Sequence, residues 1–345
     1  MKSVRSRALA LSAATAALLT AACSSDRPPA AAPTPPAPPP ATTAPAPSPS
    51  EPSASYLTGR PGDENGPVLV VKVDNSPAGR PHTGISAADV VYLEPVEGGV
   101  TRLAAVYSSR LPRRVGPVRS ARITDLELFA QYGTLAFAYS GAQKKLEPAI
   151  ARADLFEVRA EKGATKSGPG YSRSAQRTAP LNLYGSPRAL LERAPEAAEA
   201  RDIGFRFGPA VAGGRPATSA STSFRAARVA FRWSEQRERW RWVMDGTPAV
   251  ESDGTALEAS TVVFQHVRTT RSRYSDFTGA NTPYAKTVGQ GRAVVLRDGT
   301  AQRVRWSREA PDAPTVFTSG SDRVTFAEGT TWVVLVPTKG EVTVS

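Results

Sequence analysis

Hydrophobic and polar positions in the first half of the chain follow a pattern of short strands alternating with helices. The β-branched run at 68–73 is typical of a strand buried on both faces. The other elements predicted in this half are strands at 90–93, 100–107 and 134–139 and helices directly after Arg122 and at 142–151. Strands that alternate with helices indicate an α/β layered domain with a mixed sheet, which we place at residues 54–205.

The helical period disappears in the second half. A helix is predicted at 186–193, between Gly, Ser and Pro-rich stretches at 165–177 and 204–223 that we interpret as loops. Asp245-Gly246 and Asp298-Gly299 lie between apolar runs and predict hairpin turns. The strands predicted in this half are 224–243, 262–264, 292–296, 304–306 and 332–336. We therefore expect a smaller β-rich domain at 220–345, formed by an antiparallel sheet or partial barrel, and an α+β fold class for the chain.

At 237–242, arginines alternate with Glu238, Trp240 and Trp242, so one face of a strand would be basic and the other largely aromatic. A strand with this pattern could bind a polyanion, or it could carry a solvated basic face over a tryptophan-filled core. We favour the second interpretation, because basic faces also protect the edges of sheets.

The N-terminus has the layout of an export signal. Cations precede an apolar run at 8–19, which is too short to span a membrane, and small residues follow before Cys23. The arrangement resembles a bacterial lipobox, although Thr20 stands where a lipobox usually has an aliphatic residue. We interpret residues 1–23 as a lipoprotein signal peptide and lipobox, with Cys23 as the lipidated, palmitate-bearing residue. Ordinary signal cleavage beside a stray cysteine is the alternative.

Residues 24–53 are expected to form a disordered tether. From 27 to 53 they contain only Ala, Pro, Thr and Ser apart from Arg27 and Glu51, so they cannot bury a core. At about 3.1 Å per residue, a polyproline-like chain of this length would reach several nanometres. Lipidated Cys23 would anchor the protein to the outer face of the bacterial cell membrane, so the predicted location is extracytoplasmic.

The chain is basic. Its formal charge is +12 at pH 7, and loss of Lys2, Arg5 and Arg7 with the signal leaves +9. A basic exported protein favours anionic surfaces, so the expected partners are the membrane and an anionic cell-wall polymer or an envelope protein, and no nucleic acid is expected. Most of the cations are arginine, which together with the Ala and Pro bias is typical of a GC-rich genome, so net charge alone is weak evidence.

Two arginines lie where a helix is predicted to begin. Apolar residues spaced three apart predict a helix directly after Arg122, with Arg119 just before it. The first turn of a helix favours anions, so cations there need a negative partner. That partner is either an internal carboxylate or a bound phosphate or carboxylate. The candidate internal partners are Glu94, Glu97 and Asp125.

Polar side chains cluster at the predicted strand ends of the first domain, where ligands collect in open α/β sheets. The predicted ligand-binding residues are Arg119, Arg122, Arg102, Ser120, Asp74, Asn75 and Arg80. Catalysis by carboxylates is the alternative, and its candidates are Glu94, Glu97 and Asp74. No cofactor is expected, and no His-rich metal site, because the two histidines, His82 and His266, lie in different predicted domains. A metal site built on Asp74 and Glu97 is the alternative, because carboxylates can hold a metal without histidine or cysteine. Lipidation of Cys23 would leave the folded part without a thiol, which excludes disulfides and cysteine nucleophiles.

Several ordered motifs carry a resemblance to a known family. They are Val73-Asp74-Asn75, Ala78-Gly79-Arg80-Pro81, Gly84-Ile85-Ser86-Ala87-Ala88-Asp89-Val90-Val91-Tyr92, Val96-Glu97-Gly98-Gly99-Val100-Thr101-Arg102 and Val115-Gly116-Pro117-Val118-Arg119-Ser120-Ala121-Arg122. They resemble the YerB-like family of bacterial lipoproteins, a two-part domain of unknown function. Ala179-Pro180-Leu181-Asn182-Leu183-Tyr184 is similar to a later motif of that family, which often has histidine where this chain has Leu181. The resemblance implies an envelope lipoprotein with an α/β first part and a β-rich second part, in a family whose biochemical activity is not established.

These observations support three hypotheses about function. The first is a lipid-anchored cell-envelope protein that binds an anionic wall-related ligand or a protein partner, without catalysis, through an Arg-rich site at a helix N-terminus. The second is a carboxylate-dependent cell-wall hydrolase, and the third is an envelope assembly scaffold. The position of the arginines and the lack of nucleophile motifs favour the first.

Overall fold

The computed structural model describes residues 54–161, 167–276 and 278–345. The predicted signal peptide, the predicted lipidation site Cys23 and the predicted tether lie outside the described residues. No helix within the described ranges is long and apolar enough to cross a membrane.

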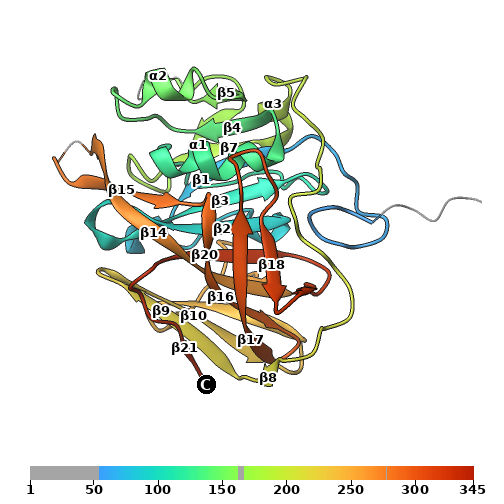
Figure 1. The fold of residues 1–345 in the computed structure, drawn as a ribbon. Helices are drawn as coiled ribbons and strands as arrows, with labels where there is room; N and C mark the ends of the chain where they lie inside the picture. The colour runs from blue at the N-terminus through green and yellow to red at the C-terminus, as the bar shows by residue number, and fades with distance from the viewer. Residues whose placement is uncertain (1–53, 162–166, 277) are drawn as a thin grey trace, which may run out of the picture. The chain divides into compact units, whose positions relative to one another are not determined.

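The first half of the chain builds a mixed sheet around β1 (Leu69–Asp74), which is buried along its whole length (Figure 1). β1 pairs antiparallel with β3 (Thr101–Tyr107) and parallel with β4 (Leu135–Tyr139). β2 (Val90–Pro95) lies antiparallel to β3, and β5 (Leu155–Arg159) lies parallel to β4. The mixed pairing predicted for this half is confirmed, and β5 is an addition that the sequence pattern did not indicate.

One strand joins this sheet to the second half of the chain. β20 (Thr331–Pro337) lies parallel both to β2 and to β14 (Thr261–Ser275), so a single large sheet has the order β19-β18-β17-β16-β14-β20-β2-β3-β1-β4-β5. All but the last residue of β20 are buried, as expected of a strand that is covered on both faces and paired at both edges. The strands that we expected in a small antiparallel sheet or partial barrel are thus divided between this mixed sheet and a second one.

The second sheet forms a separate layer against the large sheet (Figure 1). Phe231 and Trp242 of this layer pack on Trp332 of β20, with ring centroids 5.7 and 4.7 Å apart. Its strands are β9 (Ser219–Phe224), β10 (Ala227–Ser234), β11 (Arg239–Met244), β12 (Thr247–Pro248), β13 (Glu258–Ala259) and β21 (Thr343–Val344).

The alternating segment at 237–242 has the arrangement that we favoured. Trp240 and Trp242 are fully buried in the core between the sheets. Arg237 and Arg241 lie at the surface, where their Nε atoms are 2.7 and 3.6 Å from Glu258 Oε1. The interpretation of a basic face over a tryptophan-filled core is therefore confirmed.

Both predicted hairpin turns are present. Asp245 and Gly246, between β11 and β12, have φ angles of 50° and 87°. Asp298 and Gly299 have φ angles of 45° and 65° and connect β16 (Gly289–Arg297) to β17 (Thr300–Arg308). Two successive positive φ angles are characteristic of the tight turns that match the twist of paired strands, and Asp-Gly adopts them at low cost.

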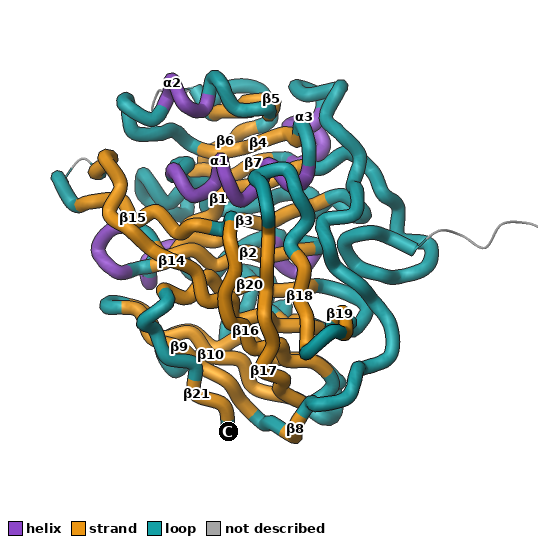
Figure 2. The backbone as a smooth tube through the Cα atoms, in the orientation of Figure 1, coloured by secondary structure: helices purple, strands orange, loops and turns teal. Residues whose placement is uncertain are grey.

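Helices are few and short, as Figure 2 shows in purple. α1 (Ile123–Phe129) begins where predicted, but α2 (Glu147–Ile150) covers only the end of the segment predicted at 142–151. Pro148 lies in the first turn of α2, the part of a helix that tolerates proline. With α3 (Pro187–Leu191), these helices are too short to cover a sheet as a layer, so the fold is largely sheet-rich and the predicted α/β layering is corrected.

The stretches interpreted as loops also contain short strands. β6 (Tyr171–Arg173) pairs with β7 (Leu183–Gly185), and β8 (Arg215–Pro216) pairs with β17. The remaining strands of the large sheet are β15 (Asn281–Lys286), β18 (Val316–Ser319) and β19 (Asp322–Arg323).

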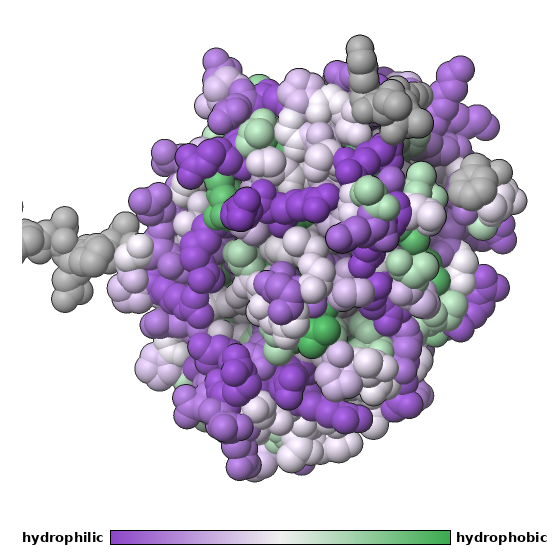
Figure 3. Space-filling model, turned by 180° about the vertical axis from the view of Figure 1, so that it is seen from behind, coloured by the Kyte–Doolittle hydropathy of each residue, from purple (hydrophilic) through white to green (hydrophobic). Residues whose placement is uncertain are grey.

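Hydrophilic residues dominate the face of the molecule seen in Figure 3. Among the described residues, the large hydrophobic side chains that are exposed are Tyr56, Leu111 and Val250. Single exposed apolar residues are normal on protein surfaces and do not by themselves indicate an interaction site.

Candidate functional site

Charged side chains, which are rare in protein cores, lie together at one end of β1, β2 and β3. Lys72 and Asp74 are two residues apart on β1 and therefore face the same side of the sheet. Arg102 on β3 stands opposite Asp74, and Glu94 on β2 stands opposite Arg102. α1 packs over this side of the sheet. The ion-pair cluster, as we name it, consists of Lys72, Asp74, Glu94, Glu97, Arg102, Arg119, Arg122 and Asp125.

A fully buried lysine is the innermost member of the cluster. Lys72 Nζ lies 2.8 Å from Glu94 Oε1 and 2.7 Å from Asp125 Oδ1. Asp125 Oδ2 also accepts a hydrogen bond from the Arg122 N–H at 2.6 Å, which satisfies a free donor at the start of α1. Two of the carboxylates proposed as partners of the arginines are thus held by a lysine that we had assigned only to a strand.

Asp74 is the buried partner of two arginines. Its Oδ2 lies 2.9 Å from Arg119 Nε and 3.3 Å from Arg102 Nη2, and its Oδ1 accepts hydrogen bonds from the N–H and the hydroxyl of Ser76. The backbone places Arg119 here, because its N–H donates to Lys72 O at 2.9 Å. Burial disfavours the charged carboxylate, but Arg102 and Ser76 outweigh it and hold the pKa of Asp74 below its ordinary value.

Glu97 pairs with Arg122 at the outer end of the cluster. Arg122 Nε lies 2.8 Å from Glu97 Oε1 and 3.0 Å from Oε2, and Thr282 of β15 donates its hydroxyl hydrogen to Oε1. The predicted pairing of Arg122 with an internal carboxylate is therefore present. Arg119 and Arg122 keep 21% and 15% of their side chains exposed, so the outer edge of the cluster reaches solvent.

A cavity of about 470 Å³ lies beside Arg122, between the segment before α2 and the β14–β15 hairpin. Its charged lining consists of Arg122, Lys144, Lys145, Glu97 and Asp276. Apolar atoms of Leu146 and Tyr274 line it as well. A concave surface with an apolar wall and a few charged groups is the usual form of a small-molecule site.

The structure brings only some of the predicted binding residues together. Asn75 points toward the second sheet, where its Nδ2 donates to Thr101 Oγ1 at 2.7 Å and lies 3.9 Å from Met244 Sδ. Arg80 pairs with Asp245 at 2.7 Å, outside the cluster. The predicted residues that do meet are Asp74, Arg102, Arg119 and Arg122 in the cluster and Ser120 on the cavity.

Sequence reasoning missed Lys144 and Lys145, because the apolar positions around them predicted a helix at 142–151. The structure leaves both lysines outside α2 and exposed at the cavity. Pro148 was the available signal, since proline in a helical pattern often marks its first turn and would have moved the start of the helix beyond the lysines.

The pKa of Glu94 is raised to about 8, because the carboxyl is buried and stands beside Asp125, and the attraction of Lys72 only partly offsets this. Its Oε2 also lacks a hydrogen-bond partner within the described ranges of the chain. The folded state therefore retains a proton that the unfolded chain releases near pH 4.5, and the free energy of unfolding is expected to fall as pH rises toward 8.

The pH window from 6.5 to 8 isolates this effect. His82, whose pKa burial lowers from 6.5 to about 4, contributes a change of opposite sign that fades as pH rises above 6.5, and so does His266, whose pKa burial also lowers. We expect urea denaturation to show that Glu94→Gln flattens the decline between pH 6.5 and 8. Glu147→Gln, which alters a partly exposed pair with Arg159, is the matched control and should keep the wild-type slope. An equal slope in wild type and Glu94→Gln would contradict the prediction.

Comparisons with known proteins cover most of the described chain. Residues 57–202 match the family described as "Protein of unknown function (DUF3048) N-terminal domain", and residues 220–333 match its C-terminal domain. A protein of Bacillus subtilis (strain 168) named "Putative lipoprotein YerB" is 41% identical over 91 residues. The aligned segment is 26% of this chain and spans 27% of the length of that relative.

A solved structure shares the fold. The crystal structure of YerB protein from Bacillus subtilis superposes with a TM-score of 0.68 at 20% identity, and the match covers 84% of this chain and 99% of that chain. Identity at this level carries the fold and not the activity. The two domain matches, in order and over both halves of the chain, show that this protein belongs to the DUF3048 family, a two-part family of unknown function that includes YerB-like proteins.

Proposed function

We propose that this protein is a lipid-anchored cell-envelope protein that binds an anionic wall-related ligand, without catalysis, in the cavity beside Arg122. The lipobox-like sequence before Cys23 and the name of the Bacillus subtilis relative, a lipoprotein, support anchoring at the outer face of the cell membrane. The observation that carries the binding proposal is the cavity itself, where Arg122, Lys144 and Lys145 converge.

The charge at the cavity favours an anion. Lys144 and Lys145 are exposed, and neither has an ion-pair partner among the described residues. Glu97 orients Arg122 through its Nε, which leaves Arg122 Nη2 without a hydrogen-bond acceptor in the described part of the protein. A carboxylate or phosphate in the cavity would accept from this free donor and from the ammonium groups.

The lining also favours a ligand with an apolar part. Leu146 and Tyr274 are almost fully buried, and their remaining surface contributes to the cavity wall. A wall-derived peptide bears free carboxylates on a partly apolar backbone, so a muropeptide matches both features of the cavity. Arg102 and Arg119 would then support the site through the ion-pair cluster rather than contact the ligand, which changes the role that the sequence suggested for them.

The hydrolase hypothesis has less support. Glu97 is the candidate catalytic carboxylate that lines the cavity, and both of its oxygens are engaged by Arg122 or Thr282. A catalytic carboxylate has to reach the proton that it donates or abstracts, and the Glu97 oxygens are instead engaged by Arg122 and Thr282. Asp74 and Glu94 do not line the cavity. No specific observation favours the assembly scaffold.

Calorimetric titration of the exported protein, purified in neutral detergent, with a muropeptide that carries free carboxylates tests the proposal. We expect binding to be weakened at least about tenfold in Lys144→Ala/Lys145→Ala, because a hydrogen bond to a charged group contributes about 1.5–3 kcal/mol. Both side chains are exposed, so the fold should be retained.

The matched control is Arg152→Ala/Arg188→Ala, which removes the same charge from exposed positions that do not line the cavity. It should change the dissociation constant less than twofold. Absence of muropeptide binding, or equal weakening in both double variants, would overturn the proposed function.

A further inference from the structure

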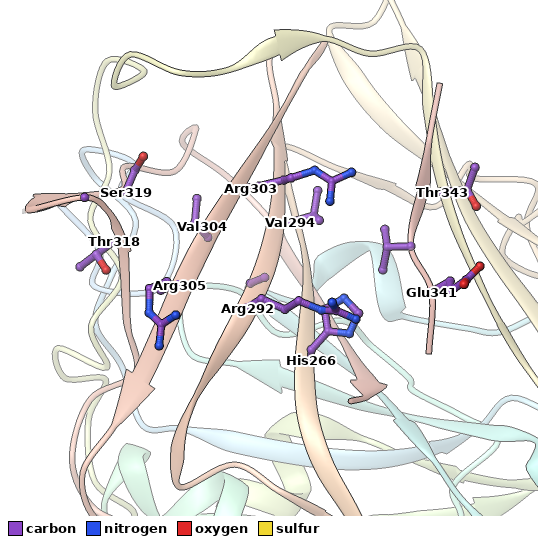
Figure 4. Close-up of a pocket in the computed structure, with 13 residues that line it drawn as sticks. His266, Arg292, Val294, Arg303, Val304, Arg305, Thr318, Ser319, Glu341 and Thr343 are labelled. Atoms are coloured by element: carbon purple, nitrogen blue, oxygen red, sulfur yellow. The ribbon is translucent and has the colours of Figure 1, made fainter. Parts of the chain in front are cut away.

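A second cavity, of about 460 Å³, lies in the other half of the chain (Figure 4). One wall is the face of the large sheet formed by β14, β16, β17 and β18. The other wall is the segment 341–343, which leads into β21 at the margin of the second sheet. The cavity thus marks the place where the second sheet stops covering the large one.

Strand register brings three arginines to this face. Arg292 of β16 stands opposite Arg305 of β17, and Arg303 stands opposite Val294. Residues directly opposite each other, and residues two apart on one strand, share a face of the sheet. Arg292, Arg303 and Arg305 therefore point to the same side, and Figure 4 shows all three at the cavity.

These arginines lack the carboxylates that the other basic strand face has. On β11 and the turn before it, Arg237 and Arg241 are paired with Glu258. Among the described residues, none of the three cavity arginines forms an ion pair. Arg292 Nη2 donates a hydrogen bond to Thr338 O at 3.3 Å. Glu341 is the single carboxylate that the described part of the chain contributes to the lining.

A buried imidazole completes the row of basic groups. On β14, Gln265 stands opposite Ala293 of β16, so these two side chains share one face of the sheet. The next residue on β14, His266, and the residue before Ala293, Arg292, therefore both lie on the other face. His266 is 5% exposed, and its Nδ1 has no hydrogen-bond partner among the residues that the structure describes. An unpaired polar atom at this depth costs free energy unless a ligand or water meets it.

The protonation of His266 is consistent with a hydrogen-bonding role. Burial, and then the neighbouring Arg292, lower its pKa, and the carbonyl of Pro337 only partly opposes them. The imidazole is therefore neutral at pH 7 and adds no repulsion between cations. An anionic oxygen beside it would accept its hydrogen or, at lower pH, stabilise its protonated form.

We propose that this cavity is a separate binding site for phosphate groups in phosphodiesters. Guanidinium groups offer paired N–H donors in the geometry of phosphate oxygens, and the three at this cavity form no ion pair with a carboxylate of the described residues. Phosphodiesters occur both in phospholipid head groups and in anionic wall polymers, and a protein held at the outer membrane face would meet either source. The site does not depend on the cavity beside Arg122.

Three soluble probes separate the two sources by calorimetry with the exported protein in neutral detergent. They are inorganic phosphate, glycerophosphoglycerol as the deacylated lipid head group, and a glycerol phosphate oligomer with several phosphodiesters. We expect glycerophosphoglycerol and the oligomer to bind. An oligomer that binds at least tenfold tighter points to a polymer, and equal affinity per phosphate points to a head group. Failure of both phosphodiesters to bind overturns the proposal.

Matched variants assign the binding to this cavity. Arg303→Gln/Arg305→Gln removes two exposed cations and should weaken phosphodiester binding at least tenfold. Arg237→Gln/Arg241→Gln removes the same charge from the paired basic face and should change the dissociation constant less than twofold. Lys144→Ala/Lys145→Ala should also leave it unchanged. Equal weakening by the two arginine pairs would mean attraction by net charge alone and would overturn the proposed site.

Discussion

Replacement of Lys72 by Met is expected to lower the free energy of unfolding by about 3–5 kcal/mol. Met has a similar length and no charge, so the change would leave Glu94 and Asp125 side by side in the core without the ammonium that they share. All three side chains are at most 1% exposed, and water cannot replace the lost partner. Urea denaturation at pH 7 would measure the loss.

Two further variants show whether charge is the cause. Lys339→Met removes an exposed lysine and should change stability by less than about 0.5 kcal/mol. Lys72→Met/Glu94→Gln/Asp125→Asn removes the ammonium and both carboxyl groups together and should recover a large part of the loss, because the Asp125 charge then no longer lies in the core without a partner. A loss below about 1 kcal/mol in Lys72→Met would show that the cluster does not depend on this ammonium.

Local patterns in the sequence were enough to predict the strands and turns that position the site. The run at 68–73 has no polar residue except Lys72, and β1 is accordingly buried throughout. The Asp-Gly pairs form tight turns because their conformation is set by the two residues themselves. The beginning of α1 was also predictable from three-residue spacing.

Pairing between distant strands was not predictable in this way. The residues of β20 have the apolar pattern of an ordinary buried strand. Nothing in them indicates that this strand lies parallel to β2, which is more than two hundred positions earlier in the sequence. The prediction of a helical layer was wrong for a related reason. A short apolar pattern such as that at 142–151 does not contain the packing partner that decides whether a helix forms.

The ion-pair partners of the arginines could not be predicted from sequence spacing either. The expected internal partners of the arginines are Glu94, Glu97 and Asp125. In the structure only Glu97 pairs with one of them, Arg122, because Glu94 and Asp125 form ion pairs with Lys72, and Arg119 pairs with Asp74 instead. Each choice depends on which side chains share a face of the sheet, and that follows from the register of β1, β2 and β3. Sequence spacing identified the members of the cluster better than the pairs within it.

Replacement of Asp74 by Asn is expected to cost about 3–5 kcal/mol of stability. Asn preserves the shape and can still accept a hydrogen bond from Ser76, but it removes the negative charge that Arg102 and Arg119 share. Arg102 is only 9% exposed, so its charge would remain near the core without the carboxylate that forms its ion pair. The free energy of unfolding from urea denaturation at pH 7 measures the effect.

Asp245→Asn provides the matched control, because Asp245 also pairs with an arginine, Arg80, at 2.7 Å. Asp245 is 37% exposed, and an ion pair near the surface contributes only about 0–1 kcal/mol, so this variant should lose far less stability than Asp74→Asn. Equal losses would show that burial does not set the strength of these pairs. If Asp74→Asn were neutral, the arginines would be held by their backbone positions and free to serve a ligand, and the supporting role that we assign to the ion-pair cluster would be wrong.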